Sequence, residues 1–211
     1  NLSGAVTDLN RLATNVNTRD GQWHHLAGVR RGSTMFLYVD GQEVGSANTT
    51  LGSYTLASDY LYLGRDERTD VAFRGEMGET RVWMRALSTN ELAEIVALGV
   101  PGSDALSKDD LLAEYDLHAP FNAHKPGLGW LGYRIPLGAP KLGRVPMTNF
   151  TCEAVFRTTS TGAGALMGNW SNHVYNTVNL QLEGPNVVRF YLRNTDAATS
   201  LSVTPTDIST R

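Results

Sequence analysis

The chain has 211 residues, 41% of them hydrophobic, and a formal net charge of −3 from 18 basic and 21 acidic residues. That length allows one large all-β core or two small domains. The balanced charge excludes a basic groove for nucleic acid and a polybasic membrane anchor. No apolar stretch approaches the roughly 18 residues that would allow membrane insertion. Because the sequence begins with Asn1, we expect it to be a piece of a larger protein.

The first half of the chain predicts strands of an antiparallel β-sandwich. Short runs of alternating or β-rich residues are separated by turn signals, with 21 glycines and 8 prolines in the whole chain. Asp40-Gly41 between two such runs is among the strongest hairpin signals. We interpret Trp23 and Trp83, which sit on predicted strands, as residues that lie in the core or flank it. The predicted strands of this half are 23–30, 34–39, 42–45, 60–64 and 78–84.

One helix is predicted after these strands. Ser88-Thr89-Asn90-Glu91 is a capping box, and Leu92, Ile95 and Val96 form an apolar stripe before Gly99 and Pro101. A second cap at 107–110 predicts a short helix over Leu111-Leu112-Ala113. Between 121 and 145 the chain is rich in Gly and Pro, which predicts a long loop or linker with at most one strand. Strands resume at 150–158, 164–169, 177–182 and 187–193.

Cys152 is the sole cysteine, so the chain forms no intrachain disulfide and no cysteine-based zinc site. Period-2 alternation puts Cys152 on the same strand face as Phe150, Ala154 and Phe156. The pattern predicts a small core residue and not a nucleophile.

Three segments resemble the LamG and pentraxin-like jelly rolls of the concanavalin A-like lectin/glucanase superfamily. Residues 20–29, DGQWHHLAGV, are similar to the "DGxWHHVA" strand, and residues 37–41, LYVDG, to the "LYVDG" hairpin. Residues 75–88, GEMGETRVWMRALS, are similar to the closing strand that leads into the capped helix. The resemblance implies an all-β, antiparallel jelly-roll sandwich with one short helix.

The order of the segments is shifted relative to that family. Its opening strands, of the kind "FTxEAWVRT" followed by "GNW", are matched only after the linker, by residues 150–158 and 168–170. We therefore predict residues 1–98 to be the C-terminal half of a LamG-like jelly roll, 99–148 a linker with a short helix and a Gly/Pro-rich loop, and 149–211 the N-terminal half. Setting Arg211 against Arg19, an offset of 192 residues, gives six identities in 19 positions. This overlap indicates a cut across a tandem repeat.

A half sandwich does not stand alone, because its inner face and strand edges would be left in water. Two arrangements solve this. In the first, which we favour, the halves close within one chain as a single permuted domain. In the second, they pair between chains and form a swapped dimer or filament, which is self-association through exchanged half-domains. In either arrangement the duplicated segments 1–19 and 193–211 compete for one place in the sheet.

Candidate catalytic motifs fail on spacing. His24 and His25 are adjacent on a strand and point to opposite faces, so they do not chelate one ion. Residues 127–132 match GxGxxG, but no helix is predicted after them. Related glucanases carry catalytic carboxylates two and four residues apart, on one strand face. A spacing of three predicts Glu76 and Glu79 on opposite faces, which argues against an enzyme.

Calcium is the metal that the resemblance implies, since LamG and pentraxin domains often bind Ca²⁺ at one rim through carboxylates and carbonyls. The loop after the strand at 60–64 supplies Asp66, Glu67 and Asp70, with Glu76 close behind. Arg65 and Arg68 interrupt this set, so a solvated loop of ion pairs is the competing interpretation.

Binding is the function that the sequence favours. Trp130, Tyr133, Trp170 and Tyr175 fall in predicted loops, where rings either stack on a ligand or anchor the loop. We expect a carbohydrate- or glycoprotein-binding module of a larger protein, in an extracellular location or on a cell or particle surface. The alternative is a structural spacer repeat of an adhesin, fibre or particle surface. The fold does not decide between them.

Overall fold

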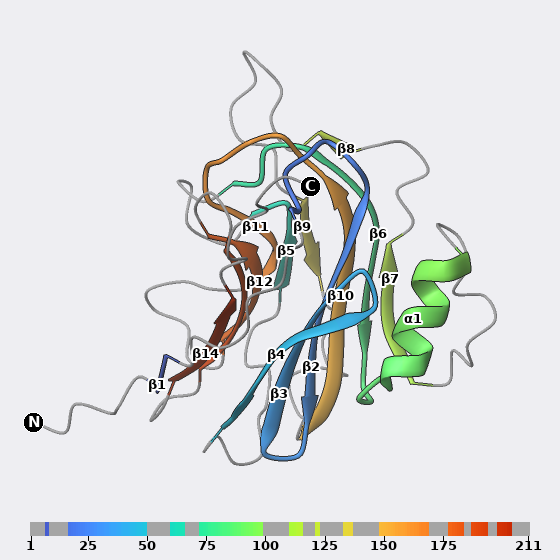
Figure 1. Cartoon of the computed structure of the whole chain (residues 1–211), viewed down its shortest axis with the longest axis vertical. Coiled ribbons are helices and arrows are strands. Elements are labelled where there is room, and N and C mark those ends of the chain that lie inside the picture. The colour runs from blue at the N-terminus through green and yellow to red at the C-terminus, as the bar shows by residue number, and fades with distance from the viewer. Residues whose placement is uncertain are drawn as a thin grey trace, which may run out of the picture.

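In the computed structural model, the described residues form two sheets packed face to face, with one helix outside them (Figure 1). The structure describes residues 7–8, 17–49, 60–65, 72–98, 110–115, 121–122, 133–136, 148–168, 177–183, 187–193 and 198–203. The first sheet has the order β1 (Thr7–Asp8), β14 (Ala198–Val203), β13 (Val188–Arg193), β12 (Thr177–Leu182), β11 (Gly164–Gly168), β5 (Tyr60–Leu63) and β9 (Tyr133–Pro136). The second sheet has the order β4 (Gln42–Asn48), β3 (Thr34–Val39), β2 (His24–Arg31), β10 (Asn149–Arg157), β6 (Glu76–Trp83) and β7 (Leu111–Tyr115), and β8 (Phe121–Asn122) also pairs with β6. All pairs except β1 with β14 are antiparallel. The predicted antiparallel sandwich is confirmed.

Strands from both ends of the chain lie side by side in the second sheet. Strand β10 lies between β2 and β6, so that Cys152 is opposite Gly28 on one side and Val82 on the other. Strands β3 and β4 form the predicted hairpin, and its turn residues Asp40 and Gly41 have φ angles of 49° and 74°. Positive φ at both central positions matches a type I′ turn.

The core lies between the two sheets. Cys152 is 1% exposed in a cluster that also contains Phe150, Ala154 and Phe156, which confirms its predicted face. Phe150 meets Phe190 of β13 edge-on, with 6.1 Å between ring centroids. Contacts of this kind join the two sheets across the sandwich.

Helix α1 (Thr89–Leu98) covers the outer face of the second sheet, the face that points away from the first sheet (Figure 1). The predicted capping box is present: the Ser88 amide donates to Glu91 over 2.7 Å, and the Glu91 amide donates back to Ser88 Oγ over 3.3 Å. Leu92 and Ile95 are buried against Trp83 in a second apolar cluster. The helix, its cap and its apolar stripe are therefore confirmed. No described helix has both the length and the apolar character to cross a membrane.

The segment 99–148 differs from the prediction. The short helix expected over 111–113 is wrong, because Leu111–Tyr115 forms strand β7 along the edge of β6. Backbone pairing with an open sheet edge outweighs the local capping signal there. Strands β8 and β9 also come from this segment, so it contributes to both sheets and is more than a linker.

Candidate functional site

A row of three side chains crosses one end of the second sheet. Trp23 immediately precedes β2, Arg157 ends β10 and Glu76 begins β6. The pairings Phe156 with His24 and Arg157 with Glu76 place the three side by side on the outer face. Arg157 Nη2 donates to both Glu76 oxygens over 2.8 and 2.7 Å, and its guanidinium carbon lies 5.1 Å from the Trp23 ring centroid.

Trp23 is not a core residue, so of the two predicted places only a position flanking the core remains for it, whereas Trp83 is fully buried. Trp23 is 43% exposed. It follows a turn directly and precedes His24, the first residue of β2 that pairs with β10. Its ring lies beside Gly78, where an added Cβ would be 3.7 Å away. An indole on the outer face of a sheet, next to a position without a side chain, remains open to solvent.

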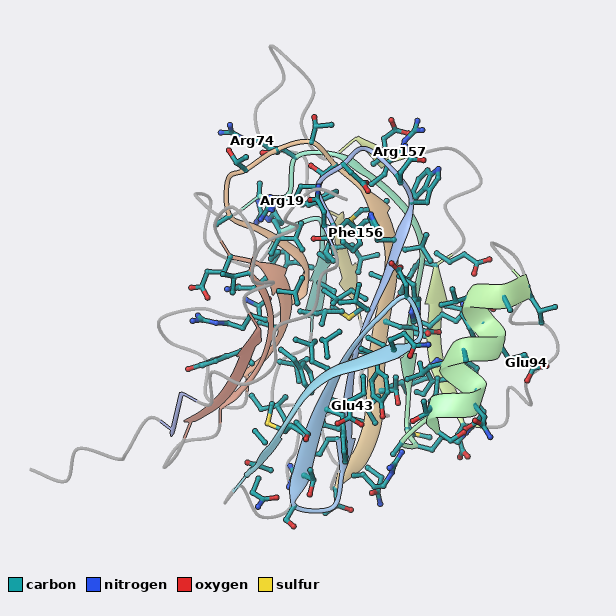
Figure 2. All side chains as sticks on the ribbon, viewed as in Figure 1. Arg19, Glu43, Arg74, Glu94, Phe156 and Arg157 are labelled. Carbon is teal, nitrogen blue, oxygen red and sulfur yellow. The ribbon has the colours of Figure 1, made fainter. Side chains whose placement is uncertain are left out.

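A pocket of about 490 Å³ adjoins this row. Figure 2 shows Arg74 and Arg157 at the same end of the sandwich. The pocket is lined by Gly21, Arg74, Gly75, Glu76, Arg157, Thr158, Thr159 and Ser160. It combines hydroxyl groups, two guanidinium groups and one carboxylate.

Close backbone contacts fix the walls of this pocket. A Cβ on Gly75 would lie 2.4 Å from the Arg157 carbonyl oxygen, so only glycine permits that approach. The Gly21 amide donates to the Thr158 carbonyl over 3.1 Å, and Gly21 has a φ of 81°. The Thr158 hydroxyl donates to the Arg74 carbonyl and accepts from the Ser160 amide over 2.9 Å. The pocket is therefore built into the fold.

His24 holds the turn that precedes Trp23. Its Nδ1 lies 2.8 Å from Asp40 and its Nε2 lies 3.0 Å from Asp20. Burial alone would lower the pKa of His24, but the hydrogen bonds and charges of Asp40 and Asp20 outweigh it, so the pKa is raised. The pKa of Asp20 is lowered, chiefly by the hydrogen bond from the Gln22 amide.

The His24 contacts give a pH dependence with a definite sign. Because the folded pKa is raised, protonated His24 stabilises the fold fully below its unfolded value of 6.5, and this contribution is lost as pH rises through the folded pKa. We expect the unfolding free energy of the wild type to fall relative to His24→Gln between about pH 5.5 and pH 8.5. Urea denaturation of both proteins across that range measures it. A constant difference between them would contradict the assignment.

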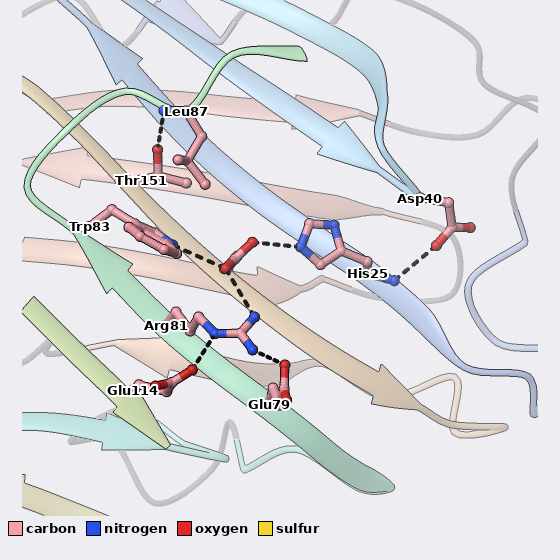
Figure 3. A network of polar contacts seen from close by, with 9 residues as sticks. His25, Asp40, Glu79, Arg81, Trp83, Leu87, Glu114 and Thr151 are labelled. Atoms are coloured by element: carbon pink, nitrogen blue, oxygen red, sulfur yellow. Dashed lines mark hydrogen bonds and ion pairs between the residues drawn. The ribbon is translucent and has the colours of Figure 1, made fainter. Parts of the chain in front are cut away.

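A second polar cluster is buried beyond the row, on the same outer face (Figure 3). Glu153 is 1% exposed; it accepts from His25 Nε2 over 2.8 Å and from Trp83 Nε1 over 3.0 Å. Arg81 lies 3.4 Å from Glu153, binds Glu114 over 2.9 Å and also contacts Glu79. Burial would raise the pKa of Glu153, but His25, Trp83 and Arg81 outweigh it and lower the pKa.

The two adjacent histidines point to opposite faces, as predicted. The His24 ring lies 6.2 Å from that of the core residue Phe156, whereas His25 reaches Glu153 on the outer face. Glu153 comes from the later part of the chain, and its partners come from the earlier part. The cluster therefore binds the two parts of the chain to each other.

The predicted opposite orientation of Glu76 and Glu79 is wrong. Met77 and Val82 both belong to the core cluster although they are five residues apart, because a β-bulge interrupts the pairing of β6 with β10. The bulge brings Glu76 and Glu79 to the same face. The two carboxylates do not act as one pair, because Glu76 binds Arg157 and Glu79 binds Arg81.

Of the other predicted site residues, the structure describes only Tyr133. The aromatic residues Trp130, Trp170 and Tyr175 and the carboxylates Asp66, Glu67 and Asp70 lie outside the described residues. Tyr133 begins β9 opposite Leu63, so the loop expected there is wrong, because pairing with β5 extends the first sheet.

Arg157 engages both oxygens of Glu76, so a calcium ion at Glu76 would compete with this ion pair. Among the described residues, no group of three histidine, cysteine, aspartate or glutamate side chains is placed to hold a metal ion. Calcium binding by the loop at 66–70 stays a prediction.

Sequence reasoning missed Trp23 and Arg157 as partners at the rim. The available signals were the Asp20-Gly21 turn directly before Trp23 and the polar run Thr158-Thr159-Ser160 directly after Arg157. Neither signal shows that these segments meet, because they are 134 residues apart in sequence and join only through the pairing of β2 with β10.

Two antiparallel sheets packed on one core form a β-sandwich of the concanavalin A-like kind, and an exposed aromatic ring lies beside a polar pocket at one end of it. Residues 1–93 match the laminin G family model described as the concanavalin A-like lectin/glucanases superfamily, so this part of the chain is similar to that superfamily. The match covers fewer than half of the residues. No curated protein and no solved structure gives a significant match.

Proposed function

We propose that this chain is a non-catalytic module that binds carbohydrate or glycoprotein, as part of a larger protein at an extracellular or particle surface. The binding site is the row of Trp23, Arg157 and Glu76 with the pocket beside it, which we call the rim site. The observation that carries the proposal is the exposed Trp23 ring beside the polar pocket. Sugars present an apolar C–H face and a rim of hydroxyl groups. An exposed indole suits the first, and a pocket with few convergent polar groups suits the second.

Replacing Trp23 with Ala is expected to abolish detectable glycan binding, because the stacking surface is removed, while Trp23→Phe retains part of it. An array of neutral and acidic glycans, probed with wild type and both variants, measures this. Leu98→Ala is the matched control, since Leu98 is 52% exposed on α1. Unchanged melting temperatures would show that folding is intact. Glycan binding by Trp23→Ala at the wild-type level would refute the rim site.

A structural spacer repeat is the second candidate, and the pairing of β1 with β14 favours it. These strands run parallel with Thr7 opposite Thr199, two positions that are 192 residues apart. That separation equals the offset of the internal repeat, so equivalent positions of the two copies meet in one sheet. A head-to-tail oligomer by light scattering, with no glycan bound on the array, would favour this candidate.

We further infer that residues 1–98 and 149–211 are the two halves of one permuted domain. The position of β10 between β2 and β6, and the cluster around Glu153, support closure within one chain.

A further inference from the structure

The Glu76–Arg157 pair at the rim leaves hydrogen-bonding groups open to a ligand. Only Nη2 of Arg157 engages Glu76, through both carboxylate oxygens. The Arg157 and Glu76 side chains are 40% and 30% exposed. Arg157 therefore keeps Nε and Nη1 as donors, and each Glu76 oxygen keeps acceptor capacity. A donor group and an acceptor group are thus held next to each other, with little freedom to separate.

The charge of this pair argues against an anionic ligand. Glu76 already neutralises Arg157 at ion-pairing distance, so a carboxylate or sulfate entering here would compete with Glu76 and be repelled by it. Arg74 also lines the pocket, but it has interactions of its own. A ligand that both donates and accepts hydrogen bonds satisfies the pair without breaking it.

Adjacent hydroxyl groups on a sugar ring meet this requirement. One hydroxyl donates to the Glu76 carboxylate while its neighbour accepts from Arg157, and the C–H face of the same ring lies against Trp23. The register that sets Arg157 opposite Glu76, with Trp23 beside Arg157, places these three groups in one row. The hydroxyls of Thr159 and Ser160 supply further partners along the pocket wall.

Resting on the binding function proposed above, we propose that the rim site selects a neutral pyranose with two adjacent free hydroxyl groups, held between the Trp23 ring and the Glu76–Arg157 pair. A pocket of about 490 Å³ falls within the range of small-ligand sites.

Glu76→Gln gives opposite results for neutral and anionic ligands. For a neutral diol, the variant loses the charged acceptor, and we expect affinity to fall about 10- to 100-fold. For an anionic glycan, removal of the negative charge would strengthen binding. Isothermal titration with the best neutral glycan from the array, and with its uronate counterpart, measures both. Glu94→Gln on α1 is the matched control, because Glu94 is exposed and far from the pocket (Figure 2).

Salt provides a second measurement that does not depend on a variant. Binding of a neutral sugar is expected to change less than twofold between about 50 and 500 mM salt, whereas binding of an anion would weaken steeply. Binding confined to acidic glycans, or strengthened by Glu76→Gln, overturns the selection of a neutral sugar while leaving the rim site intact. Absence of glycan binding by the wild type overturns the binding function itself, whereas wild-type binding by Trp23→Ala overturns the rim site.

Discussion

Replacing Glu153 with Gln is expected to lower the free energy of unfolding by about 3–5 kcal/mol, the usual cost of removing one partner of a buried ion pair. Glu153 is 1% exposed and accepts from His25 and Trp83 while lying against Arg81. The amide is neutral, and it meets His25 and Trp83 with one acceptor oxygen in place of two. The Arg81 guanidinium would stay buried, with less negative charge around it.

Urea denaturation of the wild type and Glu153→Gln measures this loss. Glu43→Gln is the matched control, because Glu43 is exposed on β4 of the same sheet (Figure 2), and we expect its effect to stay within about 0.5 kcal/mol. A Glu153→Gln effect below about 1 kcal/mol would show that the cluster does not hold the two parts of the chain together.

The contribution of this cluster to the free energy of unfolding decreases as the pH falls. Because the pKa of Glu153 is lowered in the folded state, its stabilising contribution is present above its ordinary pKa and is lost as the pH falls through the folded value. His24 behaves in the opposite sense, since its pKa is raised. The two groups therefore favour the folded state together on the mildly acidic side of neutrality.

The elements that could be predicted from sequence are those with local causes. The Asp40-Gly41 turn requires positive φ at two adjacent positions, and the Ser88–Glu91 box satisfies helix amides within one turn. The inward face of Cys152 follows from unbroken alternation along β10. Each depends on a few consecutive residues and on no partner elsewhere in the chain.

The features that the sequence did not predict depend on contacts with a partner strand. The bulge in β6 shifts the alternation between Met77 and Val82, and only the register against β10 reveals it. The same alternation that turns Cys152 inward turns Glu153 outward, where local sequence predicts solvent. The outer face around Glu153 is nevertheless buried, because Trp83, Arg81 and His25 converge on it from neighbouring strands.

The second large effect is expected at Gly28, where β2 of the second sheet lies against Phe190 of the first sheet. A Cβ at Gly28 would lie 2.4, 2.5 and 2.8 Å from three atoms of the Phe190 ring. Phe190 is fully buried and packs edge-on against Phe150, so it has little room to move. Gly28→Ala is therefore expected to destabilise the fold by about 1–3 kcal/mol through overpacking, even though alanine reduces the entropy of the unfolded chain.

Phe190→Leu is expected to relieve part of that loss. The smaller side chain makes room for the added methyl group, so the double variant Gly28→Ala/Phe190→Leu should lose at least about 1 kcal/mol less than the two single losses combined. Gly162→Ala is the control: the nearest atom to its Cβ, Ser160 Oγ, would be 3.6 Å away, so a neutral or slightly stabilising effect is expected. Strictly additive losses would mean that Gly28 of β2 and Phe190 of β13 do not meet in solution. Coupling between them would instead show that strands from the two ends of the chain close on one core, because these residues are 162 positions apart and belong to different sheets.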